Sequence, residues 1–236
     1  MLITFEGIEA CGKGEQIRRT GNYLHSKGIS YFVNQEPGGM AHGLLERMLL
    51  KNPTKVALAL NDSFRDLILD YPQIPFENGV VEPSEPETEI LRFLISWFEN
   101  TIKRVKPEIA AGKVVLSDRH LHSTKAYQGY GRYQGKREIL DLIDHLHDLF
   151  IFPTAQIDKT FYLDISYEEQ EKRKALAKGR DPGDIFENQV PDAFARIING
   201  YKEMARTDSR VMLIDGMGTP EEVFSRIKPE LDKLLE

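Results

Sequence analysis

The sequence predicts an α/β fold, a three-layer sandwich in which a five-stranded parallel sheet is flanked by helices. Five short apolar runs alternate with helical segments, and they span residues 2–5, 29–33, 114–116, 160–163 and 211–214. Continuous apolar runs of this length are typical of strands that are buried on both faces. Their alternation with helices favours βαβ units with right-handed crossovers.

The size and composition indicate a single domain over residues 1–236. Hydrophobic residues make up 41% of the chain and charged residues 29%, as in globular proteins. The net charge of -6 argues against broad attraction to nucleic acid. The first strand begins at once and no apolar run approaches the ~18 residues of a membrane span, so we expect a cytoplasmic protein without nucleic-acid or membrane partners. The single cysteine excludes an internal disulfide framework and a multi-cysteine metal site.

A glycine-bounded turn with a lysine joins the first predicted strand to a predicted helix over residues 15–25. This arrangement is the context of a P-loop, in which backbone N–H groups and the helix N-terminus hold phosphates and Lys13 reaches the β and γ oxygens. The alternative is an ordinary glycine-rich turn. The pattern has Ser or Thr after the lysine as a ligand for Mg²⁺, and this chain has glycine there. The predicted phosphate-binding residues are Gly7, Ile8, Glu9, Ala10, Cys11, Gly12, Lys13, Gly14 and Glu15.

Acidic, basic and glycine residues follow the predicted strands, at the sheet edge where ligands of parallel α/β folds bind. Asp118 and Arg119 follow the run 114–116 after a single serine. The carboxylate is suited to hold Mg²⁺ through water, and the guanidinium to bind a phosphate bidentately. A structural ion pair between the two is the alternative. The hydroxyls, amide and phenol of residues 123–129 are suited to read a pyrimidine edge and a sugar, with a capped helix start as the alternative.

Two segments stand out by charge. Five cations among residues 172–180 lead into a Gly/Pro-containing stretch, which predicts a phosphate-closing lid over about residues 172–187, with a solvated helix face as the alternative. Residues 66–91 carry seven acidic residues and no Lys or Arg. We expect a long acidic loop over about residues 72–87, which is either a solvated insertion or a partner-binding surface.

Two helices are each predicted to bury an apolar stripe, and a capping box marks the start of the last helix at Thr219. The stripes are Val223, Ile227, Leu231 and Leu234 in the last helix, and Ile139, Leu142, Ile143, Leu146 and Leu149 in the helix before Phe150.

Taken in order, these segments resemble the thymidylate kinases. The family pattern has Phe-Glu-Gly before the P-loop, Glu-Pro-Gly-Gly-Thr, a Phe-x3-Arg helix, Asp-Arg-Tyr/His, Ser-x-Ala-Tyr-Gln-Gly and Tyr-Leu-Asp. This chain has Phe5-Glu6-Gly7, Glu36-Pro37-Gly38-Gly39-Met40, Phe93 and Trp97 in one helix, Asp118-Arg119-His120, Ser123-Thr124-Lys125-Ala126-Tyr127-Gln128-Gly129 and Tyr162-Leu163-Asp164. The likeness spans nearly the whole chain.

The resemblance implies a P-loop NTPase-like fold with a small lid, a homodimer, and transfer of the γ-phosphoryl group of ATP to dTMP to give dTDP. It places Mg²⁺ near Asp118 and Glu36, the base on Phe93, and the deoxyribose beside Tyr127. The implied catalytic residues are Lys13, Glu36, Asp118, Arg119, Arg173 and Arg180. The implied substrate-binding residues are Glu36, Pro37, Phe93, Trp97, Arg119, Ser123, Thr124, Tyr127 and Gln128.

The chain departs from the family pattern at several positions. Gly14 replaces the hydroxyl residue, Trp97 replaces an arginine that contacts the nucleotide, and the lid lacks the arginine expected in residues 184–187. Ala10 and Met40 are further departures in the P-loop and the Gly-Gly segment. An alternative hypothesis is therefore a degenerate relative that binds nucleotide with little turnover or with altered acceptor specificity, and that acts through a partner.

Overall fold

The computed structural model describes residues 1–51, 85–151, 155–176 and 191–236. Its centre is a five-stranded, all-parallel sheet with the order β2-β3-β1-β4-β5. The strands are β1 (Leu2–Glu6), β2 (Tyr31–Gln35), β3 (Val114–Asp118), β4 (Lys159–Asp164) and β5 (Val211–Asp215). Each overlaps a predicted apolar run, with β2 beginning and ending two residues later than the run 29–33, and the prediction of a five-stranded parallel sheet is confirmed.

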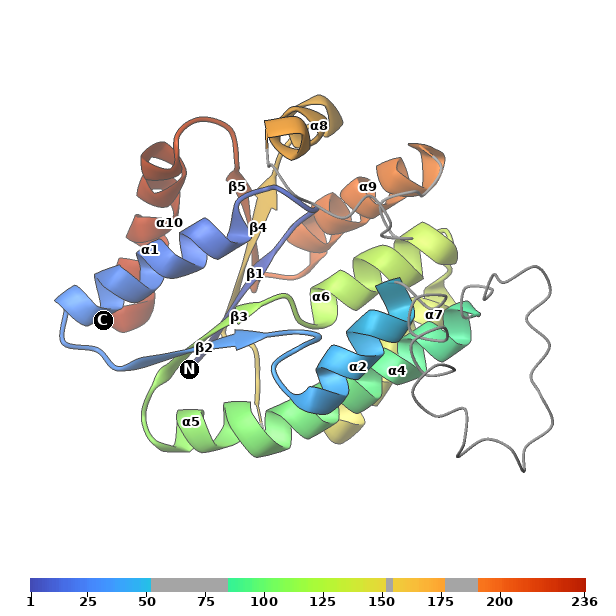
Figure 1. The fold of residues 1–236 in the computed structure, drawn as a ribbon, viewed down its shortest axis with the longest axis horizontal. Coiled ribbons are helices and arrows are strands. Elements are labelled where there is room, and N and C mark those ends of the chain that lie inside the picture. The colour runs from blue at the N-terminus through green and yellow to red at the C-terminus, as the bar shows by residue number, and fades with distance from the viewer. Residues whose placement is uncertain (52–84, 152–154, 177–190) are drawn as a thin grey trace, which may run out of the picture.

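Helices cover both faces of the sheet, with α1 and α10 on one side and α4, α6, α7 and α9 on the other (Figure 1). The prediction of three layers is thereby confirmed. The helical elements are α1 (Lys13–Ser26), α2 (Ala41–Lys51), α4 (Pro86–Asn100), η2 (Thr101–Val105), α5 (Lys106–Ala110), α6 (Leu121–Thr124), η3 (Lys125–Arg132), α7 (Arg137–Phe150), α8 (Tyr167–Leu176), α9 (Pro191–Thr207) and α10 (Pro220–Leu235). No helix within the described ranges is long and apolar enough to cross a membrane.

The last helix is as predicted. Val223, Ile227 and Leu231 of α10 are buried against the sheet and α1. At its start, the hydroxyl of Thr219 accepts a hydrogen bond from the backbone N–H of Glu222 at 3.3 Å, and the Glu222 carboxylate accepts one from the Thr219 N–H at 2.7 Å. The capping box therefore satisfies two backbone donors at this terminus.

The stripe predicted for α7 is partly wrong. Ile143 is buried as expected, but Leu142 and Leu149 are 43% and 58% exposed. The buried line of α7 runs instead through Leu140, Ile143 and His147, at helical spacing. The helix has apolar residues on more than one face, so its sequence alone did not identify which face contacts the core.

The predicted loop and lid fall largely outside the described residues. Of the acidic segment 72–87, only residues 85–87 are described, and α4 already begins at Pro86, so the loop ends earlier than predicted. Of the lid segment 172–187, residues 172–176 form the end of α8. Arg180 and residues 184–187 lie outside the described part of the chain.

Candidate active site

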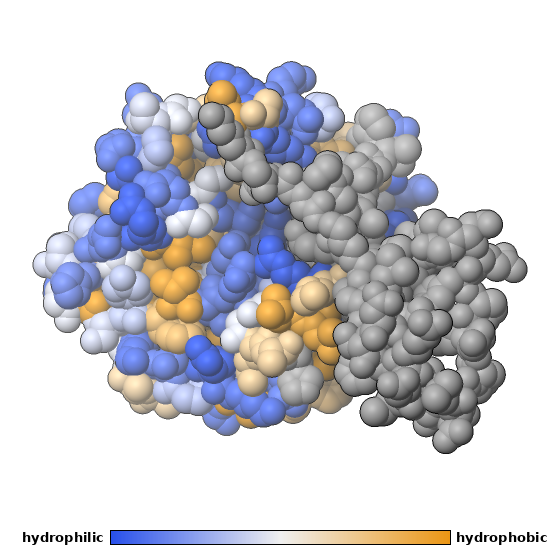
Figure 2. Space-filling view, viewed as in Figure 1, coloured by the Kyte–Doolittle hydropathy of each residue, from blue (hydrophilic) through white to orange (hydrophobic). Residues whose placement is uncertain are grey.

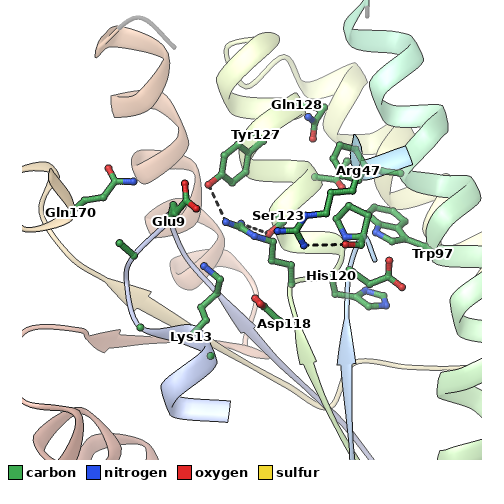
Figure 3. A pocket seen from close by; sticks show the side chains of 18 of the residues that line it. Glu9, Lys13, Arg47, Trp97, Asp118, His120, Ser123, Tyr127, Gln128 and Gln170 are labelled. Atoms are coloured by element: carbon green, nitrogen blue, oxygen red, sulfur yellow. Dashed lines mark hydrogen bonds between the residues drawn. The ribbon is translucent and has the colours of Figure 1, made fainter. Parts of the chain in front are cut away.

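A cavity of about 360 Å³ opens at the carboxyl ends of the strands, where the sequence analysis placed the ligand. Figure 3 shows side chains from widely separated segments converging on it. Its lining residues are Glu9, Ala10, Gly12, Lys13, Gly14, Glu15, Glu36, Pro37, Arg47, Phe93, Trp97, Asp118, Arg119, His120, Ser123, Thr124, Tyr127, Gln128, Gln170 and Phe194.

The P-loop closes one side of this cavity. Gly7 has φ of 137°, and a Cβ there would lie 2.8 Å from both the Cys11 sulfur and the Leu163 carbonyl oxygen, so the turn requires glycine at this position. The ammonium of Lys13 donates to the carbonyl oxygens of Gly7 at 3.1 Å and Ile8 at 3.0 Å. The loop and its lysine thus form one compact unit with a positive charge at the cavity.

Arg173 ties the base of the predicted lid to the P-loop. Its guanidinium donates to the backbone oxygen of Cys11 at 3.2 Å and to that of Gly216 at 3.0 Å. The carboxylate of Glu169, one turn earlier in α8, accepts from its Nε at 2.7 Å. Three contacts on three segments place Arg173 beside the P-loop.

Arg119 is held at the centre of the site by several contacts. Its backbone has φ of 69°, a conformation that non-glycine residues rarely adopt, and its N–H donates to the Phe5 carbonyl at 3.0 Å. Its guanidinium donates to the Ser123 hydroxyl at 3.0 Å and lies 5.1 Å from the ring centre of Tyr127. Burial alone would lower the pKa of Arg119, but the oxygens of Tyr127 and Tyr201 and the neighbouring carboxylates outweigh it and raise the pKa well above its usual range. The group is permanently charged.

Glu6 organises the loop that carries Arg119, a role that the sequence analysis missed. The fully buried carboxylate accepts hydrogen bonds from the His120 N–H at 2.7 Å, from the Ser123 hydroxyl, and from the Tyr201 hydroxyl at 3.1 Å. Burial raises its pKa, against the opposing effect of His122 and of these hydrogen bonds. The signal was present as an acid at the end of an apolar strand, but its partners lie more than a hundred residues away.

Asp118 faces the cavity with one oxygen unused. Its Oδ1 is buried and accepts no hydrogen bond among the described residues. In the same part of the chain, no ion pair joins Asp118 to Arg119, so the alternative of a structural pair is not what the structure shows. A carboxylate oxygen without a protein partner at the edge of a phosphate site is suited to a water-bound cation.

Glu36 is buried among neutral donors. The hydroxyl of Ser96 donates to one carboxyl oxygen at 3.1 Å, and the amide of Asn100 donates to the other. Burial raises the pKa of Glu36 from 4.5 to about 8, and the hydrogen bonds from Asn100, Ser96 and Asn34 only partly oppose this effect. This raised pKa favours the protonated, neutral form of Glu36 at pH 7.

The compartment opposite the P-loop is lined by aromatic and amide side chains, among them Phe93, Trp97, Tyr127 and Gln128. Trp97 is buried and stacks on the His120 ring, with 5.9 Å between ring centres and 5° between planes. Burial, with a smaller effect of His147 and His122, holds the pKa of His120 well below its usual range, so this ring is neutral. An aromatic stack thus occupies the place where the family pattern has an arginine.

The structure adds three lining residues that the sequence analysis did not single out: Arg47, Gln170 and Phe194. Arg47 comes from α2 and donates to the Pro37 carbonyl at 3.3 Å. It reaches into the cavity from the side opposite Lys13 (Figure 3). Its sequence signal was weak, since it is one of several charged residues in a short helix after the Gly38-Gly39 turn and belongs to no motif.

A phosphate loop on one side of a cavity, with Arg119 and Arg47 across from it beside an aromatic compartment, defines a P-loop kinase of nucleoside monophosphates. The thymidylate kinase family model matches residues 79–227. A thymidylate kinase from Carboxydothermus hydrogenoformans is 33% identical over 99% of this chain and 97% of its own length, and one from Fervidobacterium nodosum is 31% identical over 96% of each. The crystal structure of thymidylate kinase from Ehrlichia chaffeensis superposes with a TM-score of 0.62 at 26% identity, covering 98% of each chain.

The chain belongs to the thymidylate kinase family. The predictions of the family, of its fold and of its enzymatic class are confirmed, and the reaction of that class is ATP + dTMP = ADP + dTDP.

Proposed function

We propose that this protein phosphorylates dTMP with ATP, and that Mg²⁺ accompanies the nucleotide. The observation that carries the proposal is that one cavity holds a P-loop lysine and, opposite it, a second cationic centre (Figure 3). The reaction has to bring two anionic phosphates together, so cations on both sides of one hollow are what it requires.

The residues divide between two nucleotides. The P-loop amides and Lys13 hold the phosphates of ATP, with the helix dipole of α1 adding to the attraction. Arg119 and Arg47 bind the phosphate of dTMP, and Phe93 stacks on its base. Phosphoryl transfer then needs no covalent enzyme intermediate, because alignment and neutralisation of charge lower the barrier. Arg173 adds positive charge beside the P-loop, and Arg180, the other predicted lid arginine, lies outside the described residues.

Asp118 fits a role in holding Mg²⁺, because its buried Oδ1 has no partner among the described residues. Mg²⁺ keeps several waters and is bound by few carboxylates together with substrate phosphates. When bound, the ion neutralises phosphate charge. Glu36, being neutral and hydrogen-bonded at both oxygens, is better suited to support the Pro37 segment than to bind a cation.

The missing hydroxyl at position 14 provides a test of the metal site. A Cβ on Gly14 would have no atom within 4 Å, so a larger side chain fits. We expect Gly14→Ser to lower the Mg²⁺ concentration at half-maximal rate by about 3–10-fold, the effect of one added polar contact. Gly14→Ala is the matched control, since it stabilises the helix without adding a ligand. An equal change in both variants would contradict the metal role.

A homodimer is the proposed assembly, supported by an exposed apolar face on α4 and α7. Phe98 of α4 and Phe150 of α7 pack edge to face at 6.1 Å and still stay 41% and 43% exposed. Adjacent exposed apolar side chains are typical of protein interfaces. Figure 2 shows further hydrophobic surface over α2. The exposed apolar residues are Leu44, Leu45 and Met48 on α2, Leu91, Ile95 and Phe98 on α4, and Leu142, Leu149 and Phe150 on α7.

Sedimentation equilibrium tests the dimer. We expect the wild-type chain to sediment as a dimer and Ile95→Glu as a monomer, because a charge in an apolar interface loses its solvation. Leu213→Glu places the same charge on another exposed apolar residue, on β5, and is expected to leave the dimer intact. A monomeric wild-type chain would refute the assembly.

The activity is tested by ADP release from ATP and Mg²⁺ with dTMP, dUMP, dCMP, dGMP, dAMP and UMP as separate acceptors. The proposal predicts turnover with dTMP and weaker turnover with dUMP. Binding of ATP without transfer to any acceptor would favour the degenerate relative instead.

A further inference from the structure

The amide of Gln128 has a defined orientation at the wall of the cavity. Gln128 lies on η3 and is 1% exposed. Its Nε2 donates to the Glu89 carboxylate at 3.0 Å, and its Oε1 is buried without a hydrogen-bond partner among the described residues. In Figure 3 the amide oxygen lies on the side that faces the cavity and the nitrogen on the far side. Gln128 therefore offers its Oε1 to the cavity as a hydrogen-bond acceptor without a protein donor among the described residues.

Glu89 is itself fixed, so the amide cannot turn over. Glu89 lies on α4, one turn before Phe93, and is fully buried. Its second oxygen accepts from the Arg132 guanidinium at 2.6 Å, an ion pair that joins α4 to η3. A flipped Gln128 would point its oxygen at the carboxylate, where no proton separates the two acceptors. The ion pair therefore determines which atom of Gln128 faces the cavity.

A buried acceptor without a partner is unfavourable unless a ligand donates to it. Thymine and uracil have an N3–H donor between two carbonyl groups, whereas cytosine has a bare nitrogen acceptor at N3. Trp97 cannot favour thymine or uracil in this way, because its indole N–H can only donate and every base has a face on which the ring can stack. Gln128 can make it, provided that its oxygen stays where it is.

We propose that Glu89 and Arg132 are positioning residues that set the base specificity, by holding Gln128 as an acceptor for the N3–H of the acceptor nucleotide. The inference rests on the proposed function, since it needs dTMP in this compartment. Neither Glu89 nor Arg132 lines the cavity, so both act through Gln128. If base selectivity depends on the orientation of the Gln128 amide, then loss of the Glu89–Arg132 ion pair changes selectivity. Loss of a purely structural ion pair would change only stability.

Glu89→Gln tests the inference, because a glutamine can offer either its oxygen or its nitrogen to Gln128 and makes both orientations possible. The measurement is kcat/KM with dTMP, dUMP and dCMP at saturating ATP. We expect the ratio of dTMP to dCMP to fall about 10-fold or more, since a hydrogen bond to a charged group holds the orientation in the wild-type chain. A ratio within two-fold of the wild-type value would overturn the inference.

Two further variants separate specificity from stability. Asp144→Asn breaks the Lys125–Asp144 ion pair, which lies between η3 and α7 and spans 2.6 Å. We expect it to keep the selectivity ratio, and an equal fall in this variant would overturn the inference.

Arg132→Ala leaves the Glu89 carboxylate in place but removes its ion-pair partner. The ratio of dTMP to dCMP should therefore fall by less than in Glu89→Gln. This variant tests the inference if Glu89→Gln does not fold. A wild-type chain inactive with dTMP would instead refute the proposed function itself.

Discussion

Replacement of Arg119 by alanine is expected to lower turnover by about 10³-fold, as for other arginines that stabilise charge in phosphoryl transfer. The guanidinium is preorganised, because Ser123 and Tyr127 hold it and its own backbone is fixed to Phe5. Its loss removes charge where the two phosphates meet, while the P-loop keeps its contacts to ATP. Steady-state turnover with dTMP, together with the ATP dissociation constant, measures both effects.

Two controls accompany this experiment. Arg119→Lys keeps the charge but loses the bidentate geometry, so we expect it to restore only part of the rate. Arg137→Ala removes an arginine that is 83% exposed and pairs with Asp141 one turn along α7, and it should leave turnover unchanged. Near-normal turnover of Arg119→Ala would refute the role, and equal loss of ATP binding would show that the residue serves the P-loop side instead.

The sheet could be predicted from the sequence because its inner strands β1, β3 and β4 are almost wholly buried, and because the edge strands β2 and β5 are also apolar although Val33 and Leu213 are exposed. Such strands read as continuous apolar runs, and all five overlap observed strands. The P-loop was predictable for a related reason, since a side chain at Gly7 would bring its Cβ within 2.8 Å of a backbone oxygen and a sulfur, and only glycine avoids this clash. Both signals are local in the sequence, since one is a run of buried apolar residues and the other is a steric limit on a single residue.

The parts of the site that depend on partners distant in sequence could not be predicted. Glu6 and Ser123 are separated by 117 residues, and Gln128 and Glu89 by 39. The residue types predict that polar groups lie near a ligand. They do not predict which atom of each group already forms a hydrogen bond within the protein. In the same way, the exposed Leu142 and Leu149 of α7 have the spacing of a core stripe. Periodicity identifies an apolar face without identifying what covers it.

Trp97 illustrates a departure whose meaning required the structure. In the sequence it replaces an arginine of the family pattern, which suggested a damaged nucleotide site. In the structure it is buried, stacks on His120 and contacts the edge of the His147 ring at 6.2 Å between ring centres. The position has become part of an aromatic wall, in which Trp97 cannot make the bidentate hydrogen bonds of an arginine.

Glu36 is expected to dominate the pH dependence of stability near neutrality. Its folded pKa of about 8 exceeds the unfolded value of 4.5, so the folded state retains a proton that the unfolded state releases as the pH rises. The free energy of unfolding therefore falls between pH 4.5 and 8, and changes little on account of this group outside that window. Each pKa unit corresponds to about 1.4 kcal/mol, so the fall is on the order of 4 to 5 kcal/mol.

Glu36→Gln isolates this effect, because a glutamine keeps the shape and hydrogen bonds of the neutral acid but does not titrate. We expect urea unfolding to show wild-type stability at pH 5 and greater stability than wild type at pH 8. A parallel dependence of both proteins on pH would show that the carboxyl is charged throughout.

The same variant distinguishes the two roles considered for Glu36 in catalysis. If the neutral acid supports the Pro37 segment, turnover of Glu36→Gln at pH 7 stays within a few-fold of the wild-type value, because the amide reproduces the protonated state. If the residue instead binds Mg²⁺ as a carboxylate, the amide loses that charge, turnover falls steeply, and excess Mg²⁺ partly restores it. The buried hydrogen bonds from Ser96 and Asn100 favour the first result, since they satisfy both oxygens without a cation.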